Sequence, residues 1–269
     1  MWPQLIIVTL LAAMAQGVAG FGFTLLAVSF YLLILRSTDA VQLVILINFA
    51  ISVVLVARLW RAVPPRLWVL LAGGGLLGFP FGLWLFARAN VEIIELAVAA
   101  VTISFALAVL VQEVMGSGRG ARFAASDAEE RARDGAGEER IRGRGVAFRS
   151  ASAVAVGVSA GAMTSSLGAP GPPVALYLTG LGLDKTTFRA LELSTFIVMQ
   201  LGSLLGQSLF VGIGTGVWGY ALVLVPVAAL GAGAGHRLCH HVSETAFRHL
   251  VLLLLLATGA YMLYQVLTR

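Results

Sequence analysis

Long apolar segments are the feature that most restricts how this chain can fold. A helix needs about 20 mostly apolar residues to cross the hydrocarbon core of a bilayer. Runs of this kind fall at residues 2–35, 39–58, 67–86, 91–114, 147–183, 187–210, 216–236 and 246–267. In lipid every backbone N–H and C=O group must be paired within the protein, and the alternating pattern of membrane barrel strands is absent. The sequence therefore predicts an all-α polytopic membrane protein.

The composition agrees with this class and excludes others. Of the 269 residues, 59% are hydrophobic and 12% are charged. The net charge of +5 comes from basic residues scattered over short loops, as in the insertion signals of membrane proteins. Because they are not clustered with aromatic residues, we expect the lipid bilayer and not a nucleic acid as partner. The single cysteine, Cys239, excludes an internal disulfide.

A polar segment divides the chain into halves. Residues 116–149 contain eight arginines and six acidic residues, a composition typical of a solvated, disordered linker. We therefore predict a first membrane repeat at residues 1–115, a cytoplasmic linker at 116–149 and a second membrane repeat at 150–269.

The two halves resemble each other in the order and spacing of their segments. A shift of 148 residues places Gly20 on Gly168 and residues 37–43 on 185–191. A shift of 153 places residues 77–82 on 230–235. This correspondence predicts two homologous four-segment halves, that is, an internal repeat.

The first segment of each half is about 35 residues long, more than one crossing needs, and glycine and proline interrupt it at residues 17–23 and 168–173. Each is either one kinked crossing, which gives eight crossings and parallel repeats, or a re-entrant hairpin, which gives six crossings and inverted repeats. With a cytoplasmic linker, the hairpin arrangement leaves only Arg36, Arg88 and Arg269 outside. The positive-inside rule therefore favours inverted topology with broken, re-entrant first segments.

Broken helices at membrane depth predict a binding site. Backbone groups freed there are tolerated only beside protein or water, so the breaks should line a cavity. The N-termini of half-helices suit an anion, and Thr164, Ser165 and Ser166 add hydroxyl donors. A break alone could also be a packing kink, but two at matching positions are typical of secondary transporters.

Polar residues inside the spans supply further candidates. Arg189 and Glu192 lie three apart on one helical face, either as a surface ion pair or at a cavity entrance, where Arg189 and Lys185 would concentrate anions. Two interpretations apply to Asn48, Ser194 and Thr195: they contact the substrate, or they simply bridge neighbouring helices.

Enzymatic chemistry is not expected. The chain has no Ser-His-Asp set, no convincing pair of carboxylates and no phosphate-binding loop, so we assign no catalytic residue. Histidines 236, 240 and 241 flank a helix end and lack carboxylates at ligand spacing. We therefore expect neither a metal site nor a cofactor.

Residues 168–190, GAPGPPVALYLTGLGLDKTTFRA, strongly resemble the second-half signature of the sulfite exporter TauE/SafE family, and residues 17–35 look like its first-half turn. The resemblance implies a permease for a small anion, such as sulfite, sulfoacetate or another organosulfur or organic acid, in the bacterial inner membrane. The site residues that it implies are Gly168, Pro170, Gly171, Pro172 and Pro173 in the second break and Gly17, Gly20 and Gly22 in the first.

Together these features predict a secondary transporter that binds a small anion between two broken helices and works by alternating access. A coupling ion, either a proton or Na⁺, and a homo-oligomeric assembly are both compatible with the sequence. The alternative is a non-transporting membrane scaffold or biogenesis partner that uses the charged linker. It predicts that deletion of residues 120–145 abolishes function, whereas substitutions at 168–173 do little.

Overall fold

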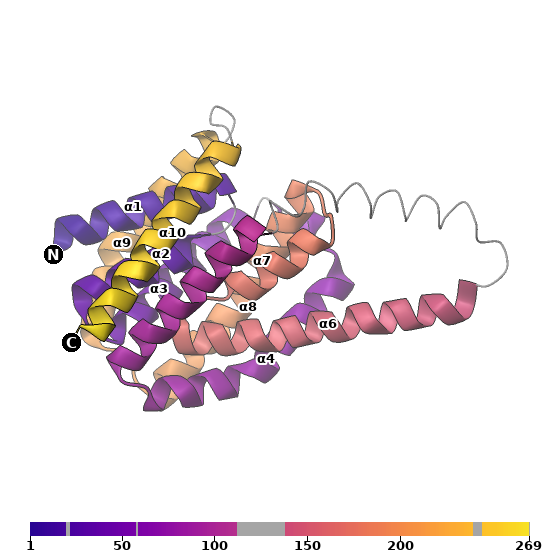
Figure 1. Cartoon of the computed structure of the whole chain (residues 1–269), viewed down its shortest axis with the longest axis horizontal. Coiled ribbons are helices and arrows are strands. Elements are labelled where there is room, and N and C mark those ends of the chain that lie inside the picture. Colours follow the sequence, from indigo (N-terminus) through magenta and orange to yellow (C-terminus); the bar gives the residue numbers. More distant parts are fainter. Residues whose placement is uncertain (20–21, 58, 112–137, 239–243, 269) are drawn as a thin grey trace.

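The computed structural model describes residues 1–19, 22–57, 59–111, 138–238 and 244–268, and throughout them the regular structure is helical (Figure 1). The helices are α1 (Trp2–Ala19), α2 (Phe23–Leu35), α3 (Asp39–Val56), the 3₁₀ turn η1 (Trp60–Ala62), α4 (Pro65–Arg88), a helix at Val91–Val111, α6 (Glu138–Leu167), α7 (Gly171–Gly180), α8 (Lys185–Phe210), α9 (Thr215–Leu238) and α10 (Glu244–Leu267). The all-α class is confirmed.

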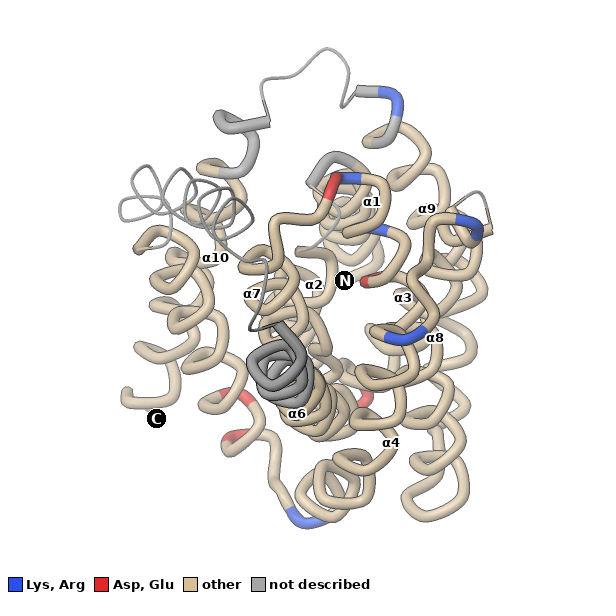
Figure 2. The backbone as a smooth tube through the Cα atoms, turned by 90° about the vertical axis from the view of Figure 1, so that its right-hand side faces the viewer, with Lys and Arg blue, Asp and Glu red and all other residues tan. Residues whose placement is uncertain are grey.

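Seven of these helices are long and apolar enough to cross a membrane. They carry large apolar side chains on their outer faces, and Leu222, Leu209 and Leu77 are between 71% and 80% exposed. Water would penalise such a surface heavily, whereas lipid does not. Charged positions are sparse and lie mostly near helix ends (Figure 2). The chain is therefore an integral membrane protein.

Helices α4 and α6 pack closely because glycines remove the side chains between them. A Cβ at Gly78 would lie 2.7 Å from the carbonyl carbon of Val158, and one at Gly82 would lie 2.8 Å from that of Ala162. Glycines four apart form a flat stripe on a helix, and close approach of backbones is the main source of helix association in lipid. The same stripe holds α6 against α4 along most of its apolar length.

Helices α1 and α9 pack in the same way. A Cβ at Gly231 would lie 2.8 Å from the carbonyl oxygen of Leu10, and one at Gly235 would lie 2.9 Å from the Cα of Met14. The shift of 153 relates these glycines to Gly78 and Gly82, and the shift of 148 relates Leu10 and Met14 to their partners in α6. Residues related by the two predicted shifts therefore make corresponding contacts.

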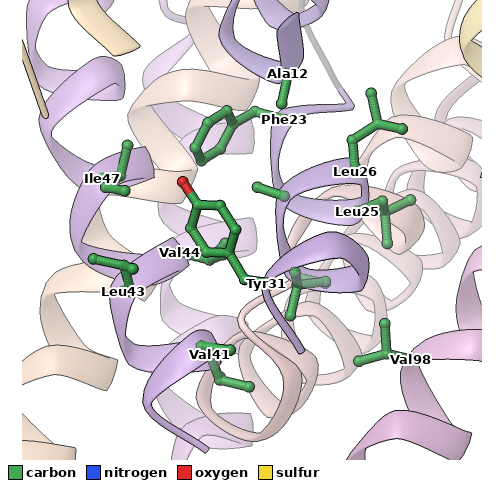
Figure 3. Close-up of a cluster of buried hydrophobic side chains, with 14 of the residues drawn as sticks. Ala12, Phe23, Leu25, Leu26, Tyr31, Val41, Leu43, Val44, Ile47 and Val98 are labelled. Carbon is green, nitrogen blue, oxygen red and sulfur yellow. The ribbon is translucent and has the colours of Figure 1, made fainter. Parts of the chain in front are cut away.

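The first segment folds back on itself. The hydroxyl groups of Thr9 in α1 and Tyr31 in α2 are hydrogen-bonded, although 22 residues separate them. A continuous helix rises 1.5 Å per residue and would keep them about 33 Å apart. Figure 3 shows Phe23 and Tyr31 of α2 beside Val44 and Ile47 of α3, in the apolar core that holds this hairpin.

Helix α6 begins at Glu138, inside the predicted linker, and projects beyond the rest of the bundle (Figure 1). Residues 116–137 of the predicted linker fall in the part of the chain that the structure does not describe. The division into two repeats and a linker therefore stays a prediction.

Candidate functional site

The second predicted break is present in the structure. Helix α6 ends at Leu167, and Gly168 adopts φ 71°, a left-handed conformation that favours glycine. The N–H of Gly168 donates to the carbonyl of Thr164 at 2.9 Å, which ends the helix with an αL cap. Helix α7 then starts with Gly171 and two prolines in its first turn.

The first predicted break is also present. Helix α1 ends at Ala19 and α2 begins at Phe23, with Gly22 before it at φ 107°. Gly20, a predicted site residue, lies outside the described residues. Two broken segments therefore end and restart at corresponding points of the chain, as the glycine and proline patterns predict.

The N-termini of α2 and α7 meet at a small void of about 10 Å³, roughly the space of one water molecule. Its lining residues come from both breaks and from two aromatic neighbours: Gln16, Gly22, Thr24, Leu25, Phe105, Gly171, Pro172 and Phe196. The first N–H groups of a helix have no acceptor within that helix, so both helix ends bring partial positive charge to this point. The donors come mainly from α2, because Pro172 and Pro173 carry no N–H.

A much larger cavity of about 830 Å³ lies between α1, α3, α8 and α9. Figure 2 shows these four helices together on one side of the bundle. The lining residues are Leu10, Gln16, Gly17, Ile51, Val54, Leu55, Leu59, Lys185, Thr186, Arg189, Leu193, Ala229, Leu230, Ala232, Gly233, Ala234 and Arg237. The volume is in the range of small-molecule sites. Among the described residues that line it, three are cations and none is an acid, so the cavity suits an anion.

Arg189 joins this cavity to the first break. Its Nη2 donates to the carbonyl oxygen of Gly17 at 2.8 Å. Gly17 lies in the last turn of α1, where carbonyl groups lack partners within the helix and the helix dipole is negative. The guanidinium group thereby completes the end of α1, and the half-buried side chain also faces the cavity.

Gln16 lines both the large cavity and the small void. Its side chain is 2% exposed, and its Nε2 has no hydrogen-bond partner. Within the described part of the chain this buried amide donor has no acceptor, which is costly, and a ligand or water is the usual explanation. Gln16 therefore marks the point where the two spaces meet.

Glu192 lies one turn after Arg189 in α8. The side chain is fully buried, and neither carboxyl oxygen has a hydrogen-bond partner. Arg189, three residues earlier, is a cation on the same face of α8. The pair is therefore not a surface ion pair, because the acid is inside the protein beside the cavity.

The comparisons with known proteins decide the family. The family model described as sulfite exporter TauE/SafE matches residues 5–262, nearly the whole chain. This chain belongs to the TauE/SafE family. The family is one of membrane transporters for sulfite export, which agrees with the predicted class. No curated protein and no solved structure gives a match.

The predicted hydroxyl donors of this TauE/SafE protein are engaged within their own helix. Thr164 Oγ1 donates to the carbonyl of Ala160 at 2.6 Å, and Ser166 Oγ to that of Ala162 at 2.7 Å. Ser165 Oγ lies 2.9 Å from the carbonyl of Gly161 and 3.1 Å from that of Phe79 in α4. None of these three residues lines the large cavity or the small void.

The other predicted residues divide into three groups. Gly17 and Arg189 line the large cavity, and Gly22, Gly171 and Pro172 line the void. Outside both are Gly168, Pro170, Pro173, Asn48, Ser194 and Thr195. The last three are buried: Ser194 Oγ donates to a carbonyl of its own helix, whereas the side-chain polar atoms of Asn48 and Thr195 have no hydrogen-bond partner.

Sequence reasoning missed Gln16 and Arg237 as site residues. Gln16 had a visible signal, because it is an amide inside an apolar run and immediately precedes Gly17. Arg237 stands near a helix end, where a cation is ordinary, so only its position across the cavity from Arg189 distinguishes it.

Proposed function

We propose that this TauE/SafE protein transports a small oxyanion of the sulfite class, which enters the 830 Å³ cavity and passes Gln16 toward the junction of the two breaks. The observation that carries the proposal is a cavity whose lining has three cations and no acid, and which meets the breaks at an unpaired buried amide. An oxyanion accepts hydrogen bonds at several oxygens, which matches the planar donors of arginine and the N–H groups of helix N-termini.

The size of the void favours a small solute. At about 10 Å³, it admits no oxyanion, so passage requires the broken helices to separate. A small, compact anion demands the least separation. A larger organic anion would fill the outer cavity but would need a wider opening between α2 and α7.

Alternating access is supported by the positions equivalent to the cavity. The shift of 148 relates Gln16 and Ile51, which line the cavity, to Thr164 and Met199. These counterparts are buried, and Thr164 Oγ1 lies 3.9 Å from the sulfur of Met199. The positions that line the cavity are therefore open, whereas the positions related to them by the shift are closely packed.

A second contact fills the counterpart region. The shift of 153 relates Ala232, in the cavity wall, to Phe79. The ring of Phe79 lies against Gly206 of α8. If the halves are inverted, as the distribution of arginine predicts, the counterpart faces the other side of the membrane. One side is then open while the other is closed.

Binding and uptake test the proposal. Sulfite, thiosulfate, sulfoacetate and acetate are each added to the purified protein, and the shift in melting temperature is measured. Sulfite uptake is then followed in liposomes. We expect Arg189→Gln to weaken sulfite binding at least about ten-fold, since a cation about 5 Å away contributes about 3 kcal/mol at an effective dielectric constant of about 20, before water screens it.

Arg66→Gln is the matched control, because Arg66 is exposed in the first turn of α4 and lines neither cavity. Gln16→Leu, which removes the unpaired amide at similar volume, should slow uptake more than it weakens binding. No binding of any of the four anions, or equal affinity in the Arg189 and Arg66 variants, would refute the proposal.

A further inference from the structure

Glu192 is a fully buried acid in α8, and anion binding alone gives it no role. It follows Arg189 by one turn, and Phe196, which lines the small void, follows it by another. On a helix, residues at these spacings share one face. Glu192 therefore lies between the residue that faces the anion cavity and the residue that faces the junction of the breaks.

The charged surroundings of Glu192 are sparse. Helix α8 packs against α3, α4, α6, α7 and η1. Among the described side chains of these elements and of α9, the titratable and charged groups are Asp39 in α3, Arg61 in η1, Arg66 and Arg88 in α4, Tyr177 in α7 and Arg237 in α9. On α8 itself they are Lys185 and Arg189. Of these two, Arg189 is the nearer to Glu192, three residues away on the same face of the helix.

Tyr177 packs against the apolar cluster that includes Leu191 and Phe196. Arg88, in the last turn of α4, lies over the ring of Trp84. The other groups lie elsewhere. Asp39 is near the opposite end of α8, since a Cβ at Gly214 would lie 3.7 Å from its carboxyl group and Gly214 follows α8 in the chain. Arg61 and Arg66 are exposed. Arg237 and Lys185 line the outer cavity and are also exposed. Arg189, three residues away on the same face of α8, is thus the cation placed to oppose the charge of Glu192.

The energetic consequence is a competition for Arg189. A buried carboxylate with no hydrogen-bond donor is costly, whereas the protonated acid is not. An ionised Glu192 also opposes a second negative charge at Arg189. When Glu192 takes up a proton, the field of Arg189 acts on the cavity without this opposition. Anion and proton therefore bind more favourably together than either does alone.

We propose that Glu192 is the proton-binding site of an anion–proton symport, in which an O–H bond forms on its carboxyl group when the anion binds at Arg189 and breaks when the anion leaves. This inference rests on the proposed function. On this face α8 adds one further oxygen, the hydroxyl group of Thr195, whereas a metal cation needs several oxygen ligands, so a proton suits the site better. A proton and a monoanion together also cross without net charge.

The test measures how the affinity for thiosulfate depends on pH. Thiosulfate is the probe because it stays fully ionised between about pH 5 and about pH 8, so any linked proton belongs to the protein. For the wild type we expect proton uptake on binding in weakly buffered solution. We also expect the affinity to fall by up to about ten-fold per pH unit where the free protein has Glu192 ionised.

Glu192→Gln, which is permanently neutral, should bind thiosulfate with little pH dependence and take up no proton. Glu192→Asp keeps a titratable acid and should keep the dependence, which guards against a merely structural effect. Glu95→Gln is the matched control, because Glu95 is another buried acid, 1% exposed, that lines neither cavity. It should behave as the wild type does.

The outcomes separate the two proposals. If the wild type binds neither thiosulfate nor sulfite, the proposed transport function fails. If it binds thiosulfate without proton uptake, or if Glu192→Gln keeps the wild-type pH dependence, the function stands and the role of Glu192 is wrong. An equal loss of pH dependence in Glu95→Gln would also overturn the assignment.

Discussion

Alanine at Gly78 is a direct test of how α4 and α6 associate. The added Cβ would overlap the carbonyl oxygen of Val158 and would lie 2.7 Å from its carbonyl carbon, whereas ordinary contact begins near 3.4 Å. Both atoms belong to backbone, so no side-chain rotation relieves the overlap. The helices must separate, and overpacking of this kind costs about 1–3 kcal/mol.

Gly73 in the same helix provides the matched control, because a Cβ there has nothing within 4 Å. Alanine in place of glycine in a helix interior gains up to about 1 kcal/mol of helix propensity. Both variants share this gain, so we expect Gly78→Ala to be about 1–3 kcal/mol less stable than Gly73→Ala. At about 2–4 °C per kcal/mol for a chain of this size, the melting temperatures should differ by at least about 2 °C.

The assay is thermal unfolding of the detergent-purified variants, followed by tryptophan fluorescence. The same comparison applies to α1 and α9, with Gly231→Ala as the test and Gly219→Ala as the control, since a Cβ at Gly219 has nothing within 4 Å. Equal melting temperatures for Gly78→Ala and Gly73→Ala would refute the close approach of α4 and α6.

Three further substitutions test the helix ends. Gly168→Ala should lower the stability by about 1–2 kcal/mol because φ is 71° there. Gly180→Ala, with open space around the added Cβ, should be nearly neutral in thermal unfolding. Equal losses of stability would be inconsistent with the cap at Gly168. Hydrogen bonds from Thr187 and Thr186 lower the pKa of the exposed Asp184 carboxyl group. The stability that the wild type has over Asp184→Ala should therefore be present above about pH 4 and vanish as the pH falls below it. A stability difference that does not depend on pH would exclude this role of Asp184. Gln207→Leu removes a 3.0 Å bond to the carbonyl of Ser165 at the end of α6 and should lower stability by about 1–2 kcal/mol. The loss should exceed that of Gln265→Leu at a half-buried position in α10, and the reverse order would contradict a capping role.

The spans could be predicted because membrane insertion depends on local composition. The apolar run at residues 39–58 corresponds to α3 (Asp39–Val56), and the run at 67–86 to α4 (Pro65–Arg88). The helix breaks could be predicted equally well, since proline and glycine act on their own backbone. These features need no knowledge of which segments meet in space.

The side chains of the site were less predictable, because their partners come from distant segments. Thr164 and Ser166 look like free donors in the sequence, yet each bonds a carbonyl four residues earlier. Serine and threonine in helices commonly satisfy themselves in this way. Gln16 has no such short-range option, so its amide remains available at the cavity. The distinction depends on side-chain length, which the spacing of polar residues does not express.

Helix α8 connects the two broken segments. Near its start Arg189 donates to the carbonyl of Gly17 at the end of α1, and near its end Gln207 donates to the carbonyl of Ser165 at the end of α6. The shift of 148 relates these two carbonyl groups. One bond borders the open cavity and the other lies in the closely packed region. Because a helix moves as a nearly rigid unit, a displacement of α8 that loosens one bond also disturbs the other. Opening on one side of the protein and closing on the other would then be two consequences of a single movement.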